Sequence, residues 1–267
     1  MGHSSIVSVK TLVRAFLDYR GLILYLLRAE LKGRHFQKML GPLWWLLEPV
    51  MFAFVYFFLA TVLFKYSGGE NYLLLIFTSV VVWRWFSRSV DNAPNMVLSY
   101  QSVVKQTNFP ILPLFYTTAL LEMTYFFFGL LALFVVCLIF GIHPTLNLIY
   151  LPIVVLVQFI FTLGIMGILA TIGAFYRDIG QVTWLITSIW FYLSPGIYPE
   201  TLIPQTLRPI YDLNPFATIL PAYRALLLEG SPPDLTRLLL WTVIFIPLML
   251  VGLNMVESRR RRYYKVL

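Results

Sequence analysis

Charged residues are scarce in this chain. Lys, Arg, Asp and Glu make up 12% of the 267 residues, and none of them occurs between Met123 and Tyr176 or between Ile179 and Pro199. Hydrophobic residues make up 59%, and the mean hydropathy is +0.79. A soluble core of this size could not bury so much apolar surface. The composition therefore excludes a water-soluble globular fold and predicts an all-α integral membrane protein that crosses the bilayer several times.

Residues that carry enzyme chemistry are equally sparse. The single cysteine, Cys137, lies in an apolar run, so neither a disulfide within the chain nor a thiolate metal site is expected. His3, His35 and His143 are scattered and do not form a metal-binding spacing. The chain contains neither a G-x-x-x-x-G-K-[ST] phosphate loop nor a G-x-S-x-G nucleophile turn. We expect no enzymatic activity, no metal and no cofactor in this chain.

The apolar runs have the lengths of membrane-spanning helices. About 20 residues of helix cross the hydrocarbon layer, and turns at residues 65–71 and 141–147 divide the runs. We therefore expect six spans within residues 43–256, preceded by residues 1–42 and followed by a basic tail at residues 257–267. The expected spans are residues 43–64, 72–92, 114–140, 148–175, 182–198 and 238–255.

The distribution of basic residues predicts the orientation in the membrane. With both termini cytoplasmic, Lys65, Arg208, Arg224 and Arg237 lie on the opposite side, and the other sixteen of the 20 Lys and Arg residues lie on or towards the cytoplasmic side. The basic tail then lies against anionic lipid headgroups. Because topology and lipid account for the net charge of +8, we expect no nucleic-acid partner.

Three segments lie outside the expected spans. Residues 13–36 repeat Leu and Ile at helical spacing with basic residues between them, which predicts an amphipathic interfacial helix. It serves either as a plain anchor or to present a lipid-linked anionic substrate. Residues 91–113 form a polar cytoplasmic connection that is long enough for a short helix at about residues 95–105. Residues 195–237 contain eight prolines yet stay apolar, which predicts short broken helices that re-enter the outer interface; the alternative is a simple loop that rests on the lipid.

Four charged residues fall inside the expected spans, where an unpaired charge is costly. An antiparallel first hairpin centred near Gly68 brings Glu48 and Arg88 to the same depth, where they could form an ion pair. Arg84 lies deeper in the second span, and Glu122 lies roughly 13 Å into the third. For all four residues, two roles stay open: an ion pair that fixes helix packing, or contact with a substrate.

The stretch FYRDIG, residues 175–180, places an adjacent cation and anion between two uncharged runs. It predicts a short cytoplasmic turn between the fourth and fifth spans. In this turn Arg177 follows the positive-inside rule and the Asp178 side chain caps the next helix. These structural roles alone could account for both residues.

Six short stretches occur in an order that is typical of one family. They are GPLWWLLEP (41–49), VVWRWFSRSVDNA (81–93), VVKQTNFPILPL (103–114), FYRDIG (175–180), YLSPGIYP (192–199) and LNPFATILPAYRALLLEG (213–230). With these stretches and six expected spans, nearly the whole chain resembles the permease subunit of ABC exporters for bacterial surface polysaccharides. That family includes O-antigen, capsule and teichoic acid exporters. Arg84 and Arg88 depart from the apolar or hydroxyl-bearing residues expected in the second stretch.

The resemblance implies a homodimer in the cytoplasmic membrane that carries two copies of a separate ATP-binding subunit. That subunit would bind ATP and Mg²⁺, and its hydrolysis of ATP would drive a lipid-linked polysaccharide through a channel between the permeases. The interfacial helix would border a lateral opening for the lipid carrier, at Arg28, Lys32 and Arg34. The implied ATPase contacts are Asn95, Tyr100, Lys105, Asn108, Phe109, Pro110, Arg177 and Asp178.

Aromatic residues, 17% of the chain, either face lipid and pack between helices or line a passage for a glycan, because sugar rings can slide along aromatic faces. The channel candidates are Trp44, Trp45, Tyr56, Phe57, Trp83, Trp85, Tyr125, Trp190 and Tyr192. Two other functions stay open. One is a permease of the same general fold that exports a drug or a small hydrophobic molecule, and the other is a membrane-embedded transferase that acts on a lipid-linked sugar.

Overall fold

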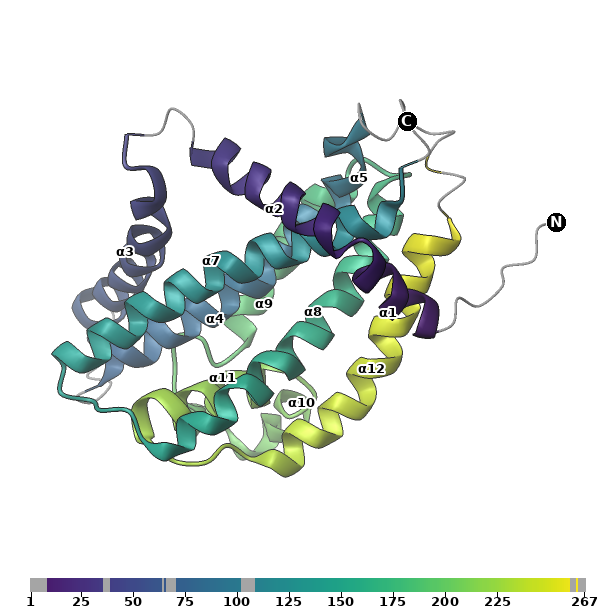
Figure 1. The fold of residues 1–267 in the computed structure, drawn as a ribbon. Coiled ribbons are helices and arrows are strands. Elements are labelled where there is room, and N and C mark those ends of the chain that lie inside the picture. The colour runs from purple at the N-terminus through teal and green to yellow at the C-terminus, as the bar shows by residue number, and fades with distance from the viewer. Residues whose placement is uncertain are drawn as a thin grey trace.

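The computed structural model describes residues 9–35, 39–63, 65, 71–101, 109–259 and 263. Regular structure within these residues is entirely helical. In Figure 1, α2 (Arg20–His35), α5 (Met96–Ser99) and the last turns of α12 (Leu235–Ser258) lie at one end of the bundle. The opposite end holds α10 (Arg208–Tyr211) and α11 (Phe216–Arg224). These are called the α5 end and the α11 end below.

Five described helical segments are long and apolar enough to cross a bilayer. The expected fifth span, residues 182–198, corresponds instead to α9 (Ile179–Leu193), whose 15 residues extend about 22 Å. The helix ends early because Ser194 takes an extended conformation, as the residue before a proline usually does, and Pro195 cannot donate a helical hydrogen bond. The count of six full-length spans is therefore not confirmed. The five segments are Trp44–Leu63, Tyr72–Ser99, Ile111–Ile139, Leu146–Gly173 and Leu235–Ser258.

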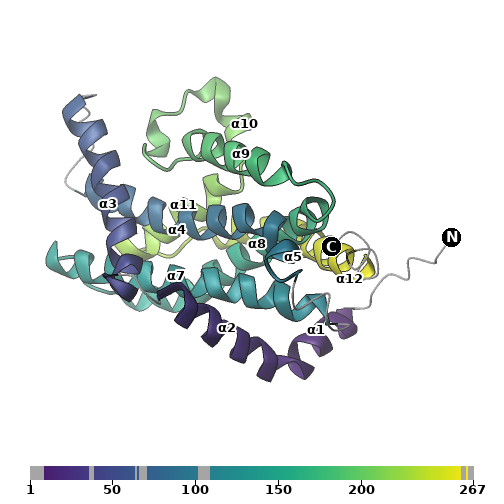
Figure 2. The same cartoon turned by 90° about the horizontal axis from the view of Figure 1, so that it is seen from above.

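The N-terminal amphipathic segment forms two helices where a single helix was expected. α1 covers Val9–Asp18 and α2 covers Arg20–His35, with Tyr19 between them. Both helices contact α7 (Ile111–Ile139) and lie outside it (Figure 2). Ile23 on α2 is 1% exposed. The pair thus packs one apolar side against the bundle and leaves the other side accessible.

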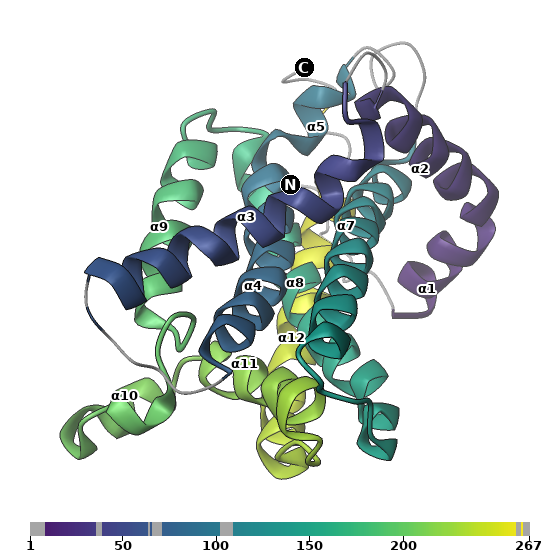
Figure 3. The same cartoon turned by 90° about the vertical axis from the view of Figure 1, so that its left-hand side faces the viewer.

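α4 lies at the centre of the molecule. α3 (Trp44–Phe58) follows a 3₁₀ turn at Gly41–Leu43 and continues as a π turn to Leu63. α4 covers Tyr72–Asn92, the same residues as the expected second span, and continues through a 3₁₀ turn at Ala93–Asn95 into α5. Its side chains are mostly buried because α3, α7, α9 and α8 (Leu151–Gly173) all contact it. Figures 2 and 3 show α9 and α2 on opposite sides of the layer that contains α4.

α8 and α12 pack closely against each other, backbone against backbone. A 3₁₀ turn at Leu146–Tyr150 leads into α8 (Leu151–Gly173). A Cβ on Gly167 would lie 2.4 Å from the carbonyl carbon of Gly252 on α12, so neither glycine has room for a side chain. Close backbone approach at small residues is how helices gain contact in lipid, where burial of apolar surface does not drive association.

Short helices connect α9 to α12, as the proline-rich composition predicted. Besides α10 and α11, they comprise 3₁₀ turns at Glu200–Leu202 and Gln205–Leu207 and a π turn at Ala225–Glu229. Arg224, 5% exposed, holds the segment in place: its Nη2 donates to Ser79 Oγ on α4 at 2.6 Å and to the Pro195 carbonyl. Re-entry of these helices into the membrane stays a prediction.

We expect Gly167→Ala to destabilise the protein by about 1–3 kcal/mol, because the added methyl group must force α8 and α12 apart. The loss is measured as a lower midpoint of thermal unfolding in detergent. Gly33→Ala is the matched control, since Gly33 lies in α2 with no atom within 4 Å of its added Cβ. An unchanged midpoint for Gly167→Ala would contradict the close contact.

Candidate functional site

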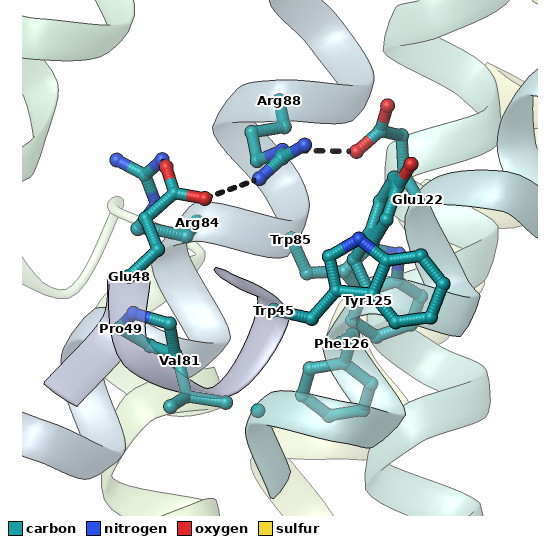
Figure 4. A pocket seen from close by; sticks show the side chains of 11 residues that line it. Trp45, Glu48, Pro49, Val81, Arg84, Trp85, Arg88, Glu122, Tyr125 and Phe126 are labelled. Atoms are coloured by element: carbon teal, nitrogen blue, oxygen red, sulfur yellow. Dashed lines mark hydrogen bonds and ion pairs between the residues drawn. The ribbon is translucent and has the colours of Figure 1, made fainter. Parts of the chain in front are cut away.

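Four charged side chains meet where α3, α4 and α7 come together. Arg88 lies between two carboxylates: its Nη1 donates to Glu48 Oε2 at 3.0 Å, and its Nε donates to Glu122 Oε2 at 3.1 Å (Figure 4). Arg84 Nη2 donates to Glu48 Oε1. The pair expected between Glu48 and Arg88 is therefore present, and the other two intramembrane charges join it. These four residues are called the charge cluster below.

Other groups compensate the cluster for its loss of hydration. Glu122 is 1% exposed, and its Oε1 accepts a hydrogen bond from Asn92 Nδ2 at 3.0 Å. The two guanidinium groups lie over aromatic rings, Arg84 at 4.5 Å from the centroid of Phe52 and Arg88 at 4.6 Å from that of Tyr125. A cation over an aromatic face is stabilised by the ring quadrupole. The cluster is therefore suited to stay charged inside the bundle.

A cavity of about 480 Å³ lies beside the cluster, between α3, α4 and α9. Arg84, Arg88 and Asp91 line it together, because residues at positions i, i+4 and i+7 share one face of a helix. Asp91 accepts a hydrogen bond from Thr187 Oγ1 on α9 at 2.9 Å. This space is called the α4–α9 cavity. It combines charged groups, hydroxyl groups and aromatic rings.

Three of the expected channel aromatics line the α4–α9 cavity: Tyr56, Trp83 and Tyr192. Tyr192 also lines an apolar groove of about 770 Å³ at the α11 end, together with Trp190, whose Nε1 donates to Asn214 Oδ1 at 3.1 Å. Because Tyr192 belongs to both, the cavity and the groove adjoin. These four aromatic residues therefore line two adjoining spaces next to α9.

The remaining expected aromatics lie elsewhere. Trp45, Trp85 and Tyr125 line a small pocket around the charge cluster, drawn in Figure 4. Phe57 packs against Tyr72, with ring centroids 6.2 Å apart. Trp44 is 47% exposed and lines none of these spaces. The structure therefore does not gather all the aromatic candidates around one path.

At the α5 end, two turns that are distant in sequence and the first turns of α9 line a groove of about 700 Å³. Asn95 comes from the turn after α4, and Arg177 comes from the FYRDIG turn. The turns touch, since a Cβ on Gly180 would lie 3.2 Å from Asn95 Nδ2. Arg177 and Asp178 are exposed, and their side chains make no hydrogen bond or ion pair with the residues that the structure describes. We call this the α5-end groove.

The expected side-chain cap at Asp178 is wrong. Asp178 occupies the N-cap position of α9, but its side chain accepts no capping hydrogen bond. Its backbone, with φ −77° and ψ −15°, is already helical, whereas a capping side chain usually requires an extended backbone at the N-cap. The carboxylate is therefore left at the surface of the turn.

The connection between α5 and α7 is described only at its two ends. Tyr100 donates a hydrogen bond to Glu30 Oε1 on α2 at 2.8 Å. Phe109 and Pro110 are partly buried directly before α7. Lys105 and Asn108 lie outside the described residues, as does the rest of the short helix expected there. Within residues 95–101, the described part of that helix consists of the end of the 3₁₀ turn, α5, a turn at Tyr100 and one further helical residue, Gln101.

Two of the three residues expected at a lateral opening are exposed on α2. Arg28 and Lys32 both point away from the packed side of the helix. The Arg34 side chain lies outside the described part of the structure. The structure thus places basic groups along the outer side of α2, near the α5 end (Figure 1).

Comparison with known families decides the class of protein. A family model described as "ABC-2 type transporter" matches residues 21–228, which is more than half of the chain. This chain belongs to the ABC-2 type transporter family. As an ABC-2 permease, it is a multi-pass membrane protein and a component of a transporter, not a catalyst.

Three curated relatives of this ABC-2 permease are named O-antigen export system permease protein RfbA. The relative from Myxococcus xanthus is 30% identical over 254 residues, covering 94% of this chain and 97% of the relative. Two relatives from Klebsiella pneumoniae are each 27% identical and cover 92% of this chain and 95% of their own length. The resemblance to polysaccharide-export permeases inferred from the short stretches is confirmed.

Two residues of the ABC-2 permease were missed by sequence reasoning. Asp91 could have been found from its spacing to Arg84 and Arg88. No sequence signal marks Tyr263, which lies in the tail expected to contact headgroups but is 1% exposed. Its hydroxyl donates to Thr171 Oγ1 at 3.2 Å, and burial raises its pKa to about 12. Among the described residues, no three His, Cys, Asp or Glu side chains form a group that could hold a metal.

We expect Arg88→Met to cost about 3–5 kcal/mol of stability, because it leaves the buried Glu122 carboxylate without its guanidinium partner. The loss is measured by SDS titration in mixed micelles. Arg84→Met is the matched control on the same helix, and its effect should be smaller because Glu48 keeps Arg88. Adding Glu122→Gln to Arg88→Met should restore at least half of the loss. Equal effects of the two single variants would refute this account of the cluster.

Proposed function

We propose that this ABC-2 permease is the transmembrane subunit of an exporter that moves a lipid-linked polysaccharide across the cytoplasmic membrane, driven by ATP hydrolysis on a separate subunit. The observation that carries the proposal is the α4–α9 cavity, where aromatic rings and polar groups lie together inside a chain of this family. The names of the curated relatives support the same class of cargo.

The proposed topology places the α5 end in the cytoplasm and the α11 end at the outer face. Both termini are then cytoplasmic, which follows the positive-inside rule. The short helices between α9 and α12 would cover the outer mouth of the passage. Two copies of the permease would form the channel and carry two ATP-binding subunits, which would hold ATP and Mg²⁺.

The lining of the cavity suits a glycan. Small-molecule sites commonly combine aromatic and apolar walls with a few polar groups that fix orientation, in volumes of roughly 300–1,000 Å³. Here Tyr56, Trp83 and Tyr192 supply rings, and Ser87 and Ser188 supply hydroxyl groups. A passage selective for a drug or another small hydrophobic molecule would not need Asp91 and two arginines on its wall.

The α5-end groove is the proposed docking surface for the ATPase. Its lining comes from the turn after α4, the FYRDIG turn and the start of α9, so a partner seated there would touch the turn after α4 and the start of α9 at once. Arg177 lines the groove and is exposed, and Asp178 is exposed next to it in the same turn. The basic outer side of α2, with Arg28 and Lys32, would border the lateral opening through which the lipid carrier enters.

Reconstitution tests the proposed function. We expect the full chain to co-purify with a separate ATP-binding subunit and, in lipid vesicles, to move a lipid-linked polysaccharide only when ATP is present. Transfer of sugar from a lipid-linked donor by this chain alone would establish a transferase instead. ATP-driven export of a hydrophobic dye without glycan export would establish the small-molecule exporter.

We expect Arg177→Ala combined with Asp178→Ala to leave the assembled complex intact but to lower substrate-stimulated ATPase activity about fivefold, the effect of losing roughly 1 kcal/mol of contact. The activity is measured on the reconstituted complex. Arg14→Ala with Asp18→Ala, which removes the same charges from the exposed surface of α1, is the control. Normal stimulation and export in the first variant would mean that the pair only sets the topology.

A further inference from the structure

We propose that the α4–α9 cavity is a binding subsite for uncharged sugar residues and that Asp91 makes it disfavour acidic ones. The inference rests on the proposed function and narrows its cargo to a neutral polysaccharide. It follows from how the charges around the cavity are distributed, and from which of them already have partners.

The two arginines on the cavity wall are already paired with carboxylates that lie outside the cavity. Arg84 and Arg88 line the cavity, but their guanidinium groups are paired with Glu48 and Glu122. Those two glutamates line the small pocket on the far side of the arginines, not the cavity. The charge cluster as a whole therefore brings no surplus positive charge to a ligand in the cavity.

Asp91 adds a negative charge that no cation offsets at close range. Its carboxylate lines the cavity and forms no ion pair within 4.0 Å with any residue that the structure describes. Its hydrogen bond from Thr187 uses Oδ1. The other oxygen is available to accept a hydrogen bond from a sugar hydroxyl group. A carboxylate or phosphate on a ligand would instead meet a like charge in a partly desolvated space, where Coulomb repulsion is stronger than in water.

The opposite wall offers surfaces for sugar rings. Trp184 and Tyr192 on α9 are eight residues apart, so they share one face of the helix, and they are 62% and 54% exposed. The apolar face of a sugar ring can lie on such a ring while its hydroxyl groups reach the α4 wall. The cavity thus offers both kinds of contact that an uncharged glycan uses.

Binding of matched oligosaccharides tests the inference. The full chain in lipid nanodiscs is titrated with a hexamer of galactose and, separately, with a hexamer of galacturonic acid. Binding is followed by tryptophan fluorescence, since Trp83 and Trp184 line the cavity. We expect the neutral hexamer to bind at least about tenfold more tightly at low salt, and the difference to shrink at high salt because screening weakens the repulsion.

Two variants test whether the charges around the cavity cause this preference for the neutral hexamer. Asp91→Asn keeps the shape of the side chain and should reduce the preference for the neutral hexamer to less than about threefold. Glu48→Gln leaves Arg84 without its carboxylate and should raise affinity for the acidic hexamer. Asp18→Asn, which removes one negative charge from the exposed end of α1, is the control and should keep the full preference.

Equal or tighter binding of the acidic hexamer to the unaltered chain overturns the inference, and so does an undiminished preference in Asp91→Asn. Binding of neither hexamer also overturns it, because the subsite would then not exist. None of these results bears on ATP-driven export in vesicles, which decides the proposed function separately.

Discussion

Ion pairs among Glu48, Arg84, Arg88 and Glu122 join α3, α4 and α7 at one depth inside the bundle. Each of these charges, if left alone near the middle of a bilayer, would cost about 2.5–3.5 kcal/mol or more. The three helices are therefore bound to a common register, because sliding any of them would separate a carboxylate from its guanidinium group. The position of the adjoining cavity depends on this register.

The two sides of α4 differ in how tightly they pack. On one side, α8 and α12 touch through glycine backbones, and Phe161 stacks between Phe86 and Phe245, with ring centroids 5.3 and 4.4 Å away. On the other side, the contact between α4 and α9 leaves open volume. Dense packing resists deformation, whereas a cavity tolerates it. Movement during transport is thus more readily accommodated on the α9 side.

Features set by local chain properties were predictable from the sequence. The length of an apolar run located α4, and equal distances along a hairpin brought Glu48 to Arg88. The end of α9 was misplaced because the uncharged run continues to Pro199, whereas the helix stops where Pro195 acts on the residue before it. The roles of Asp91 and Tyr263 depend on residues from distant helices, Thr187 and Thr171, and no single-sequence pattern specifies those contacts.

The hydrogen bond from Tyr100 to Glu30 joins the segment after α5 to the amphipathic helix α2. A bond of this kind contributes about 1 kcal/mol or somewhat more, since its acceptor is charged. If an ATPase displaces the α5 segment, α2 must either follow or lose this contact. Linkage is reciprocal, so in the proposed exporter any ligand that repositions α2 would change the affinity for the ATPase as much as the ATPase changes the affinity for that ligand. In the proposed exporter, this hydrogen bond would link the position of α2 to the position of the segment after α5.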